Sequence, residues 1–318
     1  MADVVLAAPA MPRRHGLATQ IRRHPTVFIG GGVIAAMVLI ALAAPLFAGN
    51  PLAMNPMHRL TPPSARHWFG TDNLGRDVFA RTVYGARVSL LIGILVAAGA
   101  IGGGLAIGLL AGFSRRVDRV VMRLMDGLMA IPAILLAIAL VALWHGGVAV
   151  VILAILIPEL PRDVRLVRSV VLGVREQPFV EAAVAGGART GKILRRHILP
   201  STIAPLTVQA TYVCASAILV EAGLSFLGAG IPPNIPTWGN MIAGSQLYLA
   251  IAPWTIFCPG IALAVLVLAV NLLGDGLRDW LDPRLGRRPC PRKRRCWRWP
   301  GSAPASRDRT APPTRLMA

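Results

Sequence analysis

The chain has 318 residues, of which 55% are hydrophobic and only 15% charged, whereas an ordinary soluble domain carries about 25% charged residues. Its net charge of +19 invites a nucleic-acid-binding interpretation, but no folded soluble module accompanies that charge. The apolar residues instead form blocks without Asp, Glu, Lys or Arg, at Val27–Ala48, Val88–Phe113 and Pro253–Leu273. Because a helix needs about 20 apolar residues to cross a bilayer, the composition predicts an all-α, polytopic membrane protein.

About six transmembrane helices are expected, beginning after a basic cytoplasmic leader at residues 1–26. The first span, Val27–Ala48, ends at a turn of Gly, Asn and Pro, and with the external segment that follows it makes up residues 27–86. Within that segment, residues 75–85 have the mixture of apolar and charged residues that is typical of a helix lying at the membrane interface. The second span, Val88–Phe113, is rich in glycine, which favours close helix packing.

The next two spans are less regular. A basic loop at residues 114–123 is expected to return the chain to the cytoplasm, and Leu128–Trp144 to form the third span. The fourth, Val148–Leu160, offers only about 13 apolar residues before Pro161, so we expect a short, tilted or broken helix. A partly buried helix over residues 164–172 should continue it.

A polar cytoplasmic segment, residues 173–200, leads to a fifth span at Thr202–Leu219. A long outer loop follows, and Pro253–Leu273 is the sixth span. We assign residues 87–275 to one membrane core and residues 276–318 to a cytoplasmic basic tail, which is rich in Arg and Pro and predicted to be disordered.

The distribution of charge supports this topology. With the N-terminus in the cytoplasm, 28 of the 33 Lys and Arg residues fall in segments predicted to be inside and 5 in segments predicted to be outside. Anionic lipids and the membrane potential favour basic loops on the cytoplasmic side. The charge therefore predicts the orientation of a multi-pass protein with both termini inside, and not a partnership with nucleic acid.

The cytoplasmic stretch from Glu181 to Pro200 reads EAAVAGGARTGKILRRHILP and indicates two short helices separated by a glycine turn. Pro178 suits the first turn of a helix, and Pro200 is expected to stop the second one. Ala182 and Ala183 present a small surface that another protein could approach closely. From spacing alone, an amphipathic cytoplasmic loop without a partner is an equal alternative.

A partial phosphate-binding motif lies in the same stretch. Gly186, Gly191 and Lys192 have the spacing of a P-loop, but Ile193 stands where Ser or Thr is needed to bind magnesium, and a helical pattern precedes the motif where a strand is required. We therefore expect no nucleotide site, no metal site, no bound cofactor and no catalytic site in this chain.

Several ordered motifs resemble one protein family. The pattern formed by Glu181, Ala182, Ala183, Gly187, Leu199 and Pro200 is similar to the coupling segment of permeases in binding-protein-dependent ABC importers. Four further stretches resemble the second permease subunit of dipeptide, oligopeptide and nickel importers. They are FGTDNLGRDVFAR (69–81), EAGLSFLGAG (221–230), PTWGNMI (236–242) and NLLGDGLRDWLDPR (271–284). The resemblance extends over roughly residues 25–285.

The resemblance implies a type I ABC importer permease fold and a set of partners. These are a homologous permease in a heterodimer, two ATPase subunits that bind ATP and Mg, a periplasmic substrate-binding protein and membrane lipid. The coupling segment at residues 179–198 would dock on an ATPase, and the cargo would be di- or oligopeptides, with nickel or another small solute as the alternative. The external family motif contains Asp72, Gly75, Arg76 and Asp77.

Other features leave alternatives open. Glu221 could line the translocation path as a gate, or sit at the interface bonded to a neighbouring loop. The family usually has an aromatic residue and a Tyr-Ala-Arg-like run where this chain has Pro158–Asp163, and the tail after Gly286 has no family counterpart. A stand-alone channel would leave the coupling segment unexplained. An intramembrane hydrolase would need a nucleophile–base pair or a metal cluster that the predicted spans do not offer.

Overall fold

The computed structural model describes residues 25–144 and 146–281, and within these ranges the chain forms helices, loops and no strand. The long helices are α2 (Pro25–Phe47), α3 (Val78–Phe113), α6 (Val148–Arg175), α9 (Leu199–Phe226) and α11 (Trp254–Leu281). The shorter ones are α4 (Arg115–Met129), α5 (Ala133–Leu143), α7 (Pro178–Ala185), α8 (Thr190–Ile193) and α10 (Trp238–Ser245). The predicted leader up to residue 24, the tail beyond residue 281 and the outer turn at residue 145 lie outside the described residues.

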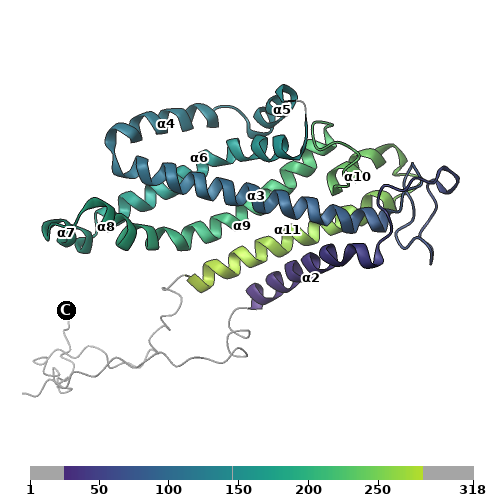
Figure 1. The fold of residues 1–318 in the computed structure, drawn as a ribbon, viewed down its shortest axis with the longest axis horizontal. Coiled ribbons are helices and arrows are strands. Elements are labelled where there is room, and N and C mark those ends of the chain that lie inside the picture. Colours follow the sequence, from purple (N-terminus) through teal and green to yellow (C-terminus); the bar gives the residue numbers. More distant parts are fainter. Residues whose placement is uncertain (1–24, 145, 282–318) are drawn as a thin grey trace, which may run out of the picture. The chain divides into compact units, whose positions relative to one another are not determined.

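The long helices fit a membrane protein. Four of them, counting α8 and α9 as the single helix Thr190–Phe226, are long and apolar enough to cross a bilayer, and a fifth span results if α4 and α5 are counted together. These two helices are bent by 89° at the break between them, which contains Pro132. Helix α6 falls outside this group because of its charged residues, yet it lies lengthwise beside α3 and occupies the place of the fourth predicted span (Figure 1).

Glycines allow α3 and α6 to pack closely. A Cβ atom added to Gly104 would lie 2.5 Å from the Cβ of Asp163, and one added to Gly108 would lie 2.7 Å from the Cβ of Val167. A Cβ atom on Gly112 would lie 2.6 Å from Val171 in the same way. Small residues four positions apart thus form the contact face, as expected for helices that associate where lipid supplies no hydrophobic driving force.

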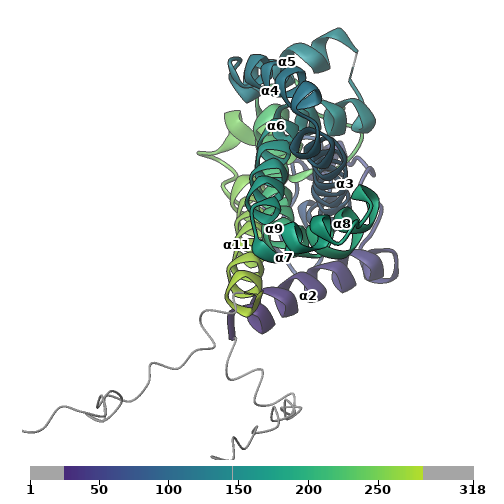
Figure 2. The same cartoon turned by 90° about the vertical axis from the view of Figure 1, so that its left-hand side faces the viewer.

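An arginine ties α2 to α3. Pro45 has no N–H group, so the carbonyl of Ala41, four residues earlier, lacks its usual helical donor. The Nε of Arg87 donates to this Ala41 carbonyl, and its Nη2 donates to the carbonyl of Leu42 at 2.9 Å. The guanidinium also lies over the Tyr84 ring, 5.2 Å from its centre. Helix α2 otherwise packs against α11, and Figure 2 shows the two helices crossing at an angle.

Three helix predictions were wrong in their limits. Residues 75–85 are not a separate interfacial helix: Asp77 caps α3, which then runs without a break from Val78 to Phe113 and through the predicted boundary at residue 87. The predicted basic loop at residues 114–123 is the start of α4, an amphipathic helix with Arg residues on its exposed side. Helix α6 is continuous although it contains Pro158 and Pro161.

The predicted stop at Pro200 was also wrong. Pro200 occupies the first turn of α9, where a missing N–H costs nothing, so the chain continues from α8 through a π-helical turn at Leu194–Ile198 into α9. The expected pair of short helices with a glycine turn is present as α7 and α8. Val180, Ile193 and Ile198 anchor this region against Val171 of α6 and Leu206 of α9.

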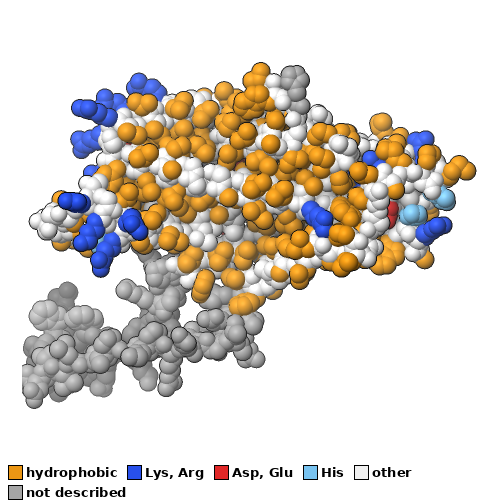
Figure 3. Space-filling model, in the orientation of Figure 1, with side chains coloured by type: hydrophobic (Ala, Val, Ile, Leu, Met, Phe, Trp, Pro, Cys, Tyr) orange, Lys and Arg blue, Asp and Glu red, His pale blue; other side chains and the backbone are white. Residues whose placement is uncertain are grey.

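The surface separates into an apolar middle and polar ends. In Figure 3 hydrophobic side chains cover the central part of the visible face, and Lys and Arg gather at the end where Figure 1 places α4, α7 and α8. The opposite end carries the residue 48–77 segment and α10. This banding is what a bilayer requires of a protein that spans it.

Candidate functional site

The external motif folds into a turn built around Asp72. Its Oδ1 accepts hydrogen bonds from the backbone N–H groups of Leu74 and Arg76, both at 2.9 Å, and its Oδ2 accepts one from Nε of Arg76 at 2.7 Å. Gly75 has φ +71°, and a Cβ atom there would lie 1.9 Å from the carbonyl oxygen of Asn55. The Asp-x-x-Gly-Arg spacing is therefore dictated by the geometry of one buried turn.

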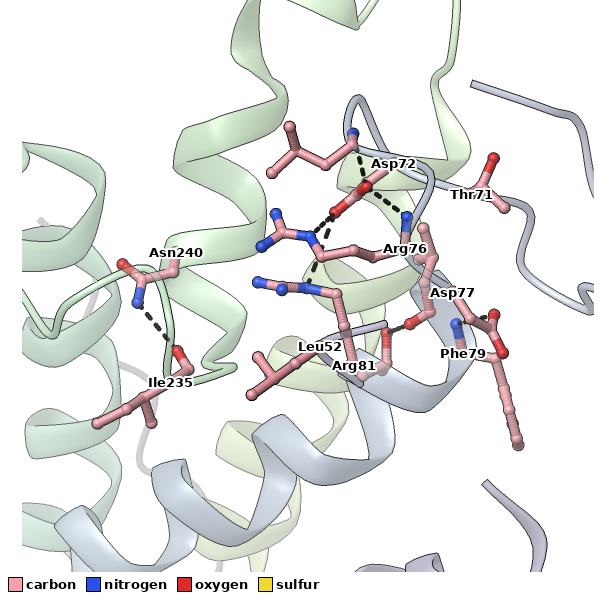
Figure 4. Close-up of polar contacts among 12 residues, drawn as sticks. Leu52, Thr71, Asp72, Arg76, Asp77, Phe79, Arg81, Ile235 and Asn240 are labelled. Atoms are coloured by element: carbon pink, nitrogen blue, oxygen red, sulfur yellow. Dashed lines mark hydrogen bonds and ion pairs between the residues drawn. The ribbon is translucent and has the colours of Figure 1, made fainter. Parts of the chain in front are cut away.

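The next residue of the motif begins α3. The carboxylate of Asp77 accepts a hydrogen bond from the N–H of Phe79 at 3.1 Å, as an N-cap does. Burial raises the pKa of the Asp77 carboxyl, an effect that the bond from Phe79 and the nearby His67 partly offset. The structure thus brings the four predicted residues Asp72, Gly75, Arg76 and Asp77 together in one turn. The turn lies at the end of the helices opposite α7 and α8, and Figure 4 shows the side chains of Asp72, Arg76 and Asp77 in it.

The other family stretches hold the outer loop against this turn. The indole N–H of Trp238, which is fully buried, donates to the carbonyl of Thr82 at 2.8 Å. Asn240 donates from its amide to the carbonyl of Ile231 at 2.9 Å. Gly239 approaches α9 so closely that a Cβ atom would lie 2.7 Å from Ser225. Trp238, Gly239 and Asn240 therefore hold the outer loop closed against α3 and α9.

Glu221 is buried at the outer end of α9, with 1% of its surface exposed. The hydroxyl of Ser225, one turn later, donates to its Oε1 at 2.9 Å. Glu221 therefore bonds to its own helix. Its role in a translocation path remains a prediction.

The cytoplasmic coupling segment has a buried face and an exposed face. Val180 and Ile193 are buried, whereas Glu181 and Ala182 are exposed and Ala183 is half-buried. Gly187, with φ +74°, ends α7 by donating to the carbonyl of Val184 at 2.9 Å. Phe179 and Val184 add exposed apolar side chains to the same region, with 50% and 59% of their surfaces exposed.

A cavity of about 440 Å³ lies beside this segment, between α7, α8 and the ends of α3 and α6. It is lined by Phe113, Arg175, Val180, Glu181, Val184 and Ala185, among others. Arg175 donates to the carbonyl of Gly112 at 2.8 Å and lies over the Phe113 ring, so it satisfies a carbonyl that the end of α3 leaves free. Leu199 and Pro200, the last residues of the pattern, lie in the first turn of α9.

The partial P-loop motif does not form a phosphate-binding loop. Gly186 and Gly187 end α7, whereas Gly191 and Lys192 lie within α8, and no strand precedes them in the part of the chain that the structure describes. A P-loop needs a strand, a glycine-rich loop and a helix in that order. The spacing is therefore coincidental.

Two ion pairs join α4 to α6. Arg168 donates from Nε and Nη2 to both oxygens of Asp118, the second bond measuring 2.7 Å, and Arg165 pairs with Asp126. The fork of Arg168 matches a carboxylate bidentately, so the pair fixes direction as well as distance. These contacts position α4 beside the helix that leads into the coupling segment.

The segment that departs from the family pattern forms a polar cluster between α6 and α9, which sequence reasoning missed. Glu159 accepts hydrogen bonds from Ser216 at 3.0 Å and from Arg162 at 3.2 Å, and Arg162 lies over the Tyr212 ring. Asp163 is completely buried beside Gly104. The charges in Pro158–Asp163 were a signal, because ionisable residues in a span usually face protein or a polar cavity.

Comparison with known proteins defines the family. Residues 104–287 match the model of the family described as "binding-protein-dependent transport system inner membrane component", and residues 17–63 match the N-terminal transmembrane domain of oligopeptide transport permease C. The chain therefore belongs to the family of ABC importer permeases, and it is a multi-pass protein of the inner membrane.

Named relatives cover most of the chain. A probable peptide ABC transporter permease of Sinorhizobium fredii is 61% identical over 290 residues, which are 91% of this chain and 100% of the relative. The dipeptide transport permease of Alkalihalophilus pseudofirmus is 44% identical, covering 84% of this chain and 88% of that protein. The glutathione transport permease of Salmonella typhimurium is 42% identical, covering 84% and 89%.

A solved structure supports the fold. The methionine ABC transporter MetNI, in an inward-facing conformation, matches with a TM-score of 0.54 at 20% identity, covering 64% of this chain and 96% of the matched chain. This similarity confirms the predicted type I importer permease fold.

Proposed function

We propose that this chain forms, with a homologous permease subunit, the translocation path for di- and oligopeptides across the bacterial inner membrane. The observation that carries the proposal is the similarity over most of the chain to relatives named as peptide and dipeptide permeases, at 61% and 44% identity. A relative named for glutathione, itself a small peptide, agrees with a cargo of this class. Nickel or another small solute is the alternative cargo.

The energy source lies in other subunits in this proposal. Two ATPase subunits bind ATP and Mg, and this chain supplies neither a cofactor site nor a catalytic one. The segment at residues 179–198 docks in a groove on an ATPase through its exposed residues, among them Phe179, Glu181 and Ala182. Its buried side chains pack against α6 and α9, and through them movement of the ATPase is transmitted to these two helices. The firm attachment of one face and the exposure of the other support this role.

The orientation follows from the charge. We place α4, α7 and α8 in the cytoplasm because Lys and Arg gather at that end (Figure 3), and both termini on the same side. The residue 49–86 and 226–252 segments then face outward, where a periplasmic substrate-binding protein delivers the cargo. Lipid surrounds the apolar middle.

Uptake by a deletion strain tests the cargo. Cells without the gene, and the same cells with it restored, are given labelled dialanine or labelled nickel ions. Loss of dialanine uptake that returns on complementation is the expected result. Selective loss of nickel uptake would replace peptide by metal as the cargo, and uptake that persists after ATP depletion would point to a channel and contradict the ATP-driven mechanism.

Cross-linking tests the docking of the coupling segment. A cysteine at Ala183, which is half-buried at the edge of the exposed face, should cross-link to a cysteine in the ATPase groove within native membranes. A cysteine at Ala137, buried between helices in the membrane core, is the matched control and should not react. Failure of the Ala183 cross-link in a complex that still transports would contradict the proposed docking.

A further inference from the structure

Two arginine side chains lie together at the outer end of the helices and point in the same direction. Figure 4 shows the guanidinium groups of Arg76 and Arg81 next to each other, both directed toward Asn240. Arg81 is almost completely buried, with 2% of its surface exposed, although it is in the first turn of α3. A buried guanidinium is costly unless an anion balances it.

The only carboxylate that pairs with these arginines in the described part of the chain is already occupied. Oδ1 of Asp72 accepts hydrogen bonds from two backbone N–H groups, and its Oδ2 accepts one from Nε of Arg76 at 2.7 Å. Its Oδ2 lies 3.9 Å from Nε of Arg81, which is too far for a hydrogen bond. Nη1 of Arg81 has no hydrogen-bond partner among the described residues. One carboxylate thus faces two guanidinium groups.

Arg76 and Arg81 both line a cavity of about 640 Å³ that opens on the outer side. Its remaining wall is polar at Asn73, Ser225 and Asn240, and apolar where the loop after α9 passes. The apolar lining includes Phe226, Leu227, Ile231 and Pro232. A smaller space of about 20 Å³ lies between Asp72, Arg81 and Thr255. A water molecule there could accept a hydrogen bond but would not balance the second positive charge.

We propose that Arg81, with Arg76 beside it, binds the terminal carboxylate of a short peptide in this cavity. A guanidinium with free N–H groups matches a carboxylate bidentately, and the apolar wall suits the last side chain of the peptide. The volume is in the range of small-molecule sites, and the recessed position of Arg81 favours a small, flexible ligand over the surface of a docking protein. This inference rests on the proposed peptide cargo and adds an outer subsite to it.

Thermal unfolding of the purified importer complex in lipid nanodiscs, without its binding protein, tests the subsite apart from transport. Dialanine should raise the unfolding temperature in a saturable way, whereas dialaninamide, which lacks the carboxylate, should not. Arg81→Gln should increase the dialanine concentration needed for a half-maximal shift by about tenfold or more, since charge-assisted hydrogen bonds are lost. Arg66→Gln, which removes an exposed charge from the same outer segment, is the control and should respond as the wild type does.

The responses to dialanine and dialaninamide decide whether the subsite binds a carboxylate. Equal responses of the wild-type complex to dialanine and dialaninamide, or none to either, would overturn the subsite, and this comparison stands even if Arg81→Gln fails to fold. Dialanine uptake that persists alongside such a negative result would leave the proposed function intact and remove only the subsite. A carboxylate-dependent response in a complex that does not take up dialanine would support the subsite and contradict the proposed dipeptide transport.

Discussion

At the scale of single residues, the outer motif shows how much structure a short sequence can dictate. Asp72 closes the turn, Gly75 allows the positive φ, Arg76 neutralises Asp72 and Asp77 starts α3. These four residues were found from the sequence through a family resemblance. Arg81 stands in the same motif, and its Nη1 has no hydrogen-bond partner among the described residues. Its burial depends on α10 and the loop after α9, which are more than 140 residues away, so local sequence could not reveal it.

Gly75→Ala should destabilise the protein by about 2 kcal/mol or more. The new methyl group would clash with the Asn55 carbonyl, which is backbone and cannot move aside, and the residue would also occupy a left-handed conformation. Thermal unfolding of the detergent-solubilised protein measures the loss. Gly49→Ala is the control, because nothing lies within 4 Å of its added Cβ atom. Equal stabilities of the two variants would show that the turn rearranges freely.

Asp77 should contribute a pH-dependent term to stability. Burial raises the pKa of its carboxyl above the ordinary value of 3.8, so the folded protein holds this proton more tightly than the unfolded chain does. The resulting stabilisation is present below that value and is lost as the pH rises through the folded pKa. Asp77→Asn should remove this part of the pH dependence, because Asn keeps the cap and carries no charge.

Unfolding temperatures measured between about pH 4 and 7 test this prediction. At pH 7 Asp77→Asn should be at least as stable as the wild type, and Asp77→Ala should lose about 1 kcal/mol because the cap is gone. An Asn variant that is no more stable than the Ala variant would contradict the capping role.

At the scale of helices, blocks of apolar residues without charge located the long apolar segments but not their ends. Helix α3 starts ten residues before the predicted span because Asp77 provides a cap that hydropathy does not register. Helix α6 was expected to be short, tilted or broken near Pro161 and to be continued by a helix over residues 164–172. The two parts form one helix, which is held along its length by the glycine face of α3 and by Ser216 of α9. Tertiary contacts decided both outcomes.

The contact between α2 and α3 gives a prediction that involves two residues. Arg87→Gln should destabilise the protein by about 1–3 kcal/mol, because the Ala41 carbonyl loses its charged donor within the apolar region. Pro45→Ala restores a backbone N–H that can bond to the same carbonyl. The double variant should therefore be less destabilised than Arg87→Gln alone, as measured by thermal unfolding in a double-mutant cycle. Simple additivity of the two changes would argue against the shared carbonyl.

At the scale of the whole molecule, the class of the protein could be predicted from hydropathy, charge bias and ordered motifs, and the family comparison confirms it. The ion pairs between α4 and α6 could not be predicted, since Asp118 and Arg168 are separated by 50 residues of sequence. The sequence also could not show that α8, the π-helical turn and α9 are continuous, because Pro200 is typical of both a helix end and a first turn.

In the exposed part of the coupling segment, a larger side chain should reduce transport without affecting folding. Ala182→Trp places a large side chain where the ATPase is proposed to approach, so peptide uptake should fall at least about tenfold, while the exposed position leaves the unfolding temperature unchanged. Ile29→Trp, at an exposed apolar position on α2, is the control and should retain uptake. Normal uptake by Ala182→Trp would exclude this surface from close contact.

The continuous helix from Thr190 to Phe226 has 37 residues and so a length of about 55 Å. It joins the coupling segment at one end to Glu221 and the outer loop at the other. A mechanical connection of this kind has no preferred direction. If engagement of an ATPase in its ATP-bound form shifts the outer end, then arrival of a loaded delivery protein at the outer end must change the affinity for that form by the same factor. Sensing of the loaded delivery protein and movement of the cargo would then depend on the same coupling free energy between the two ends of the helix.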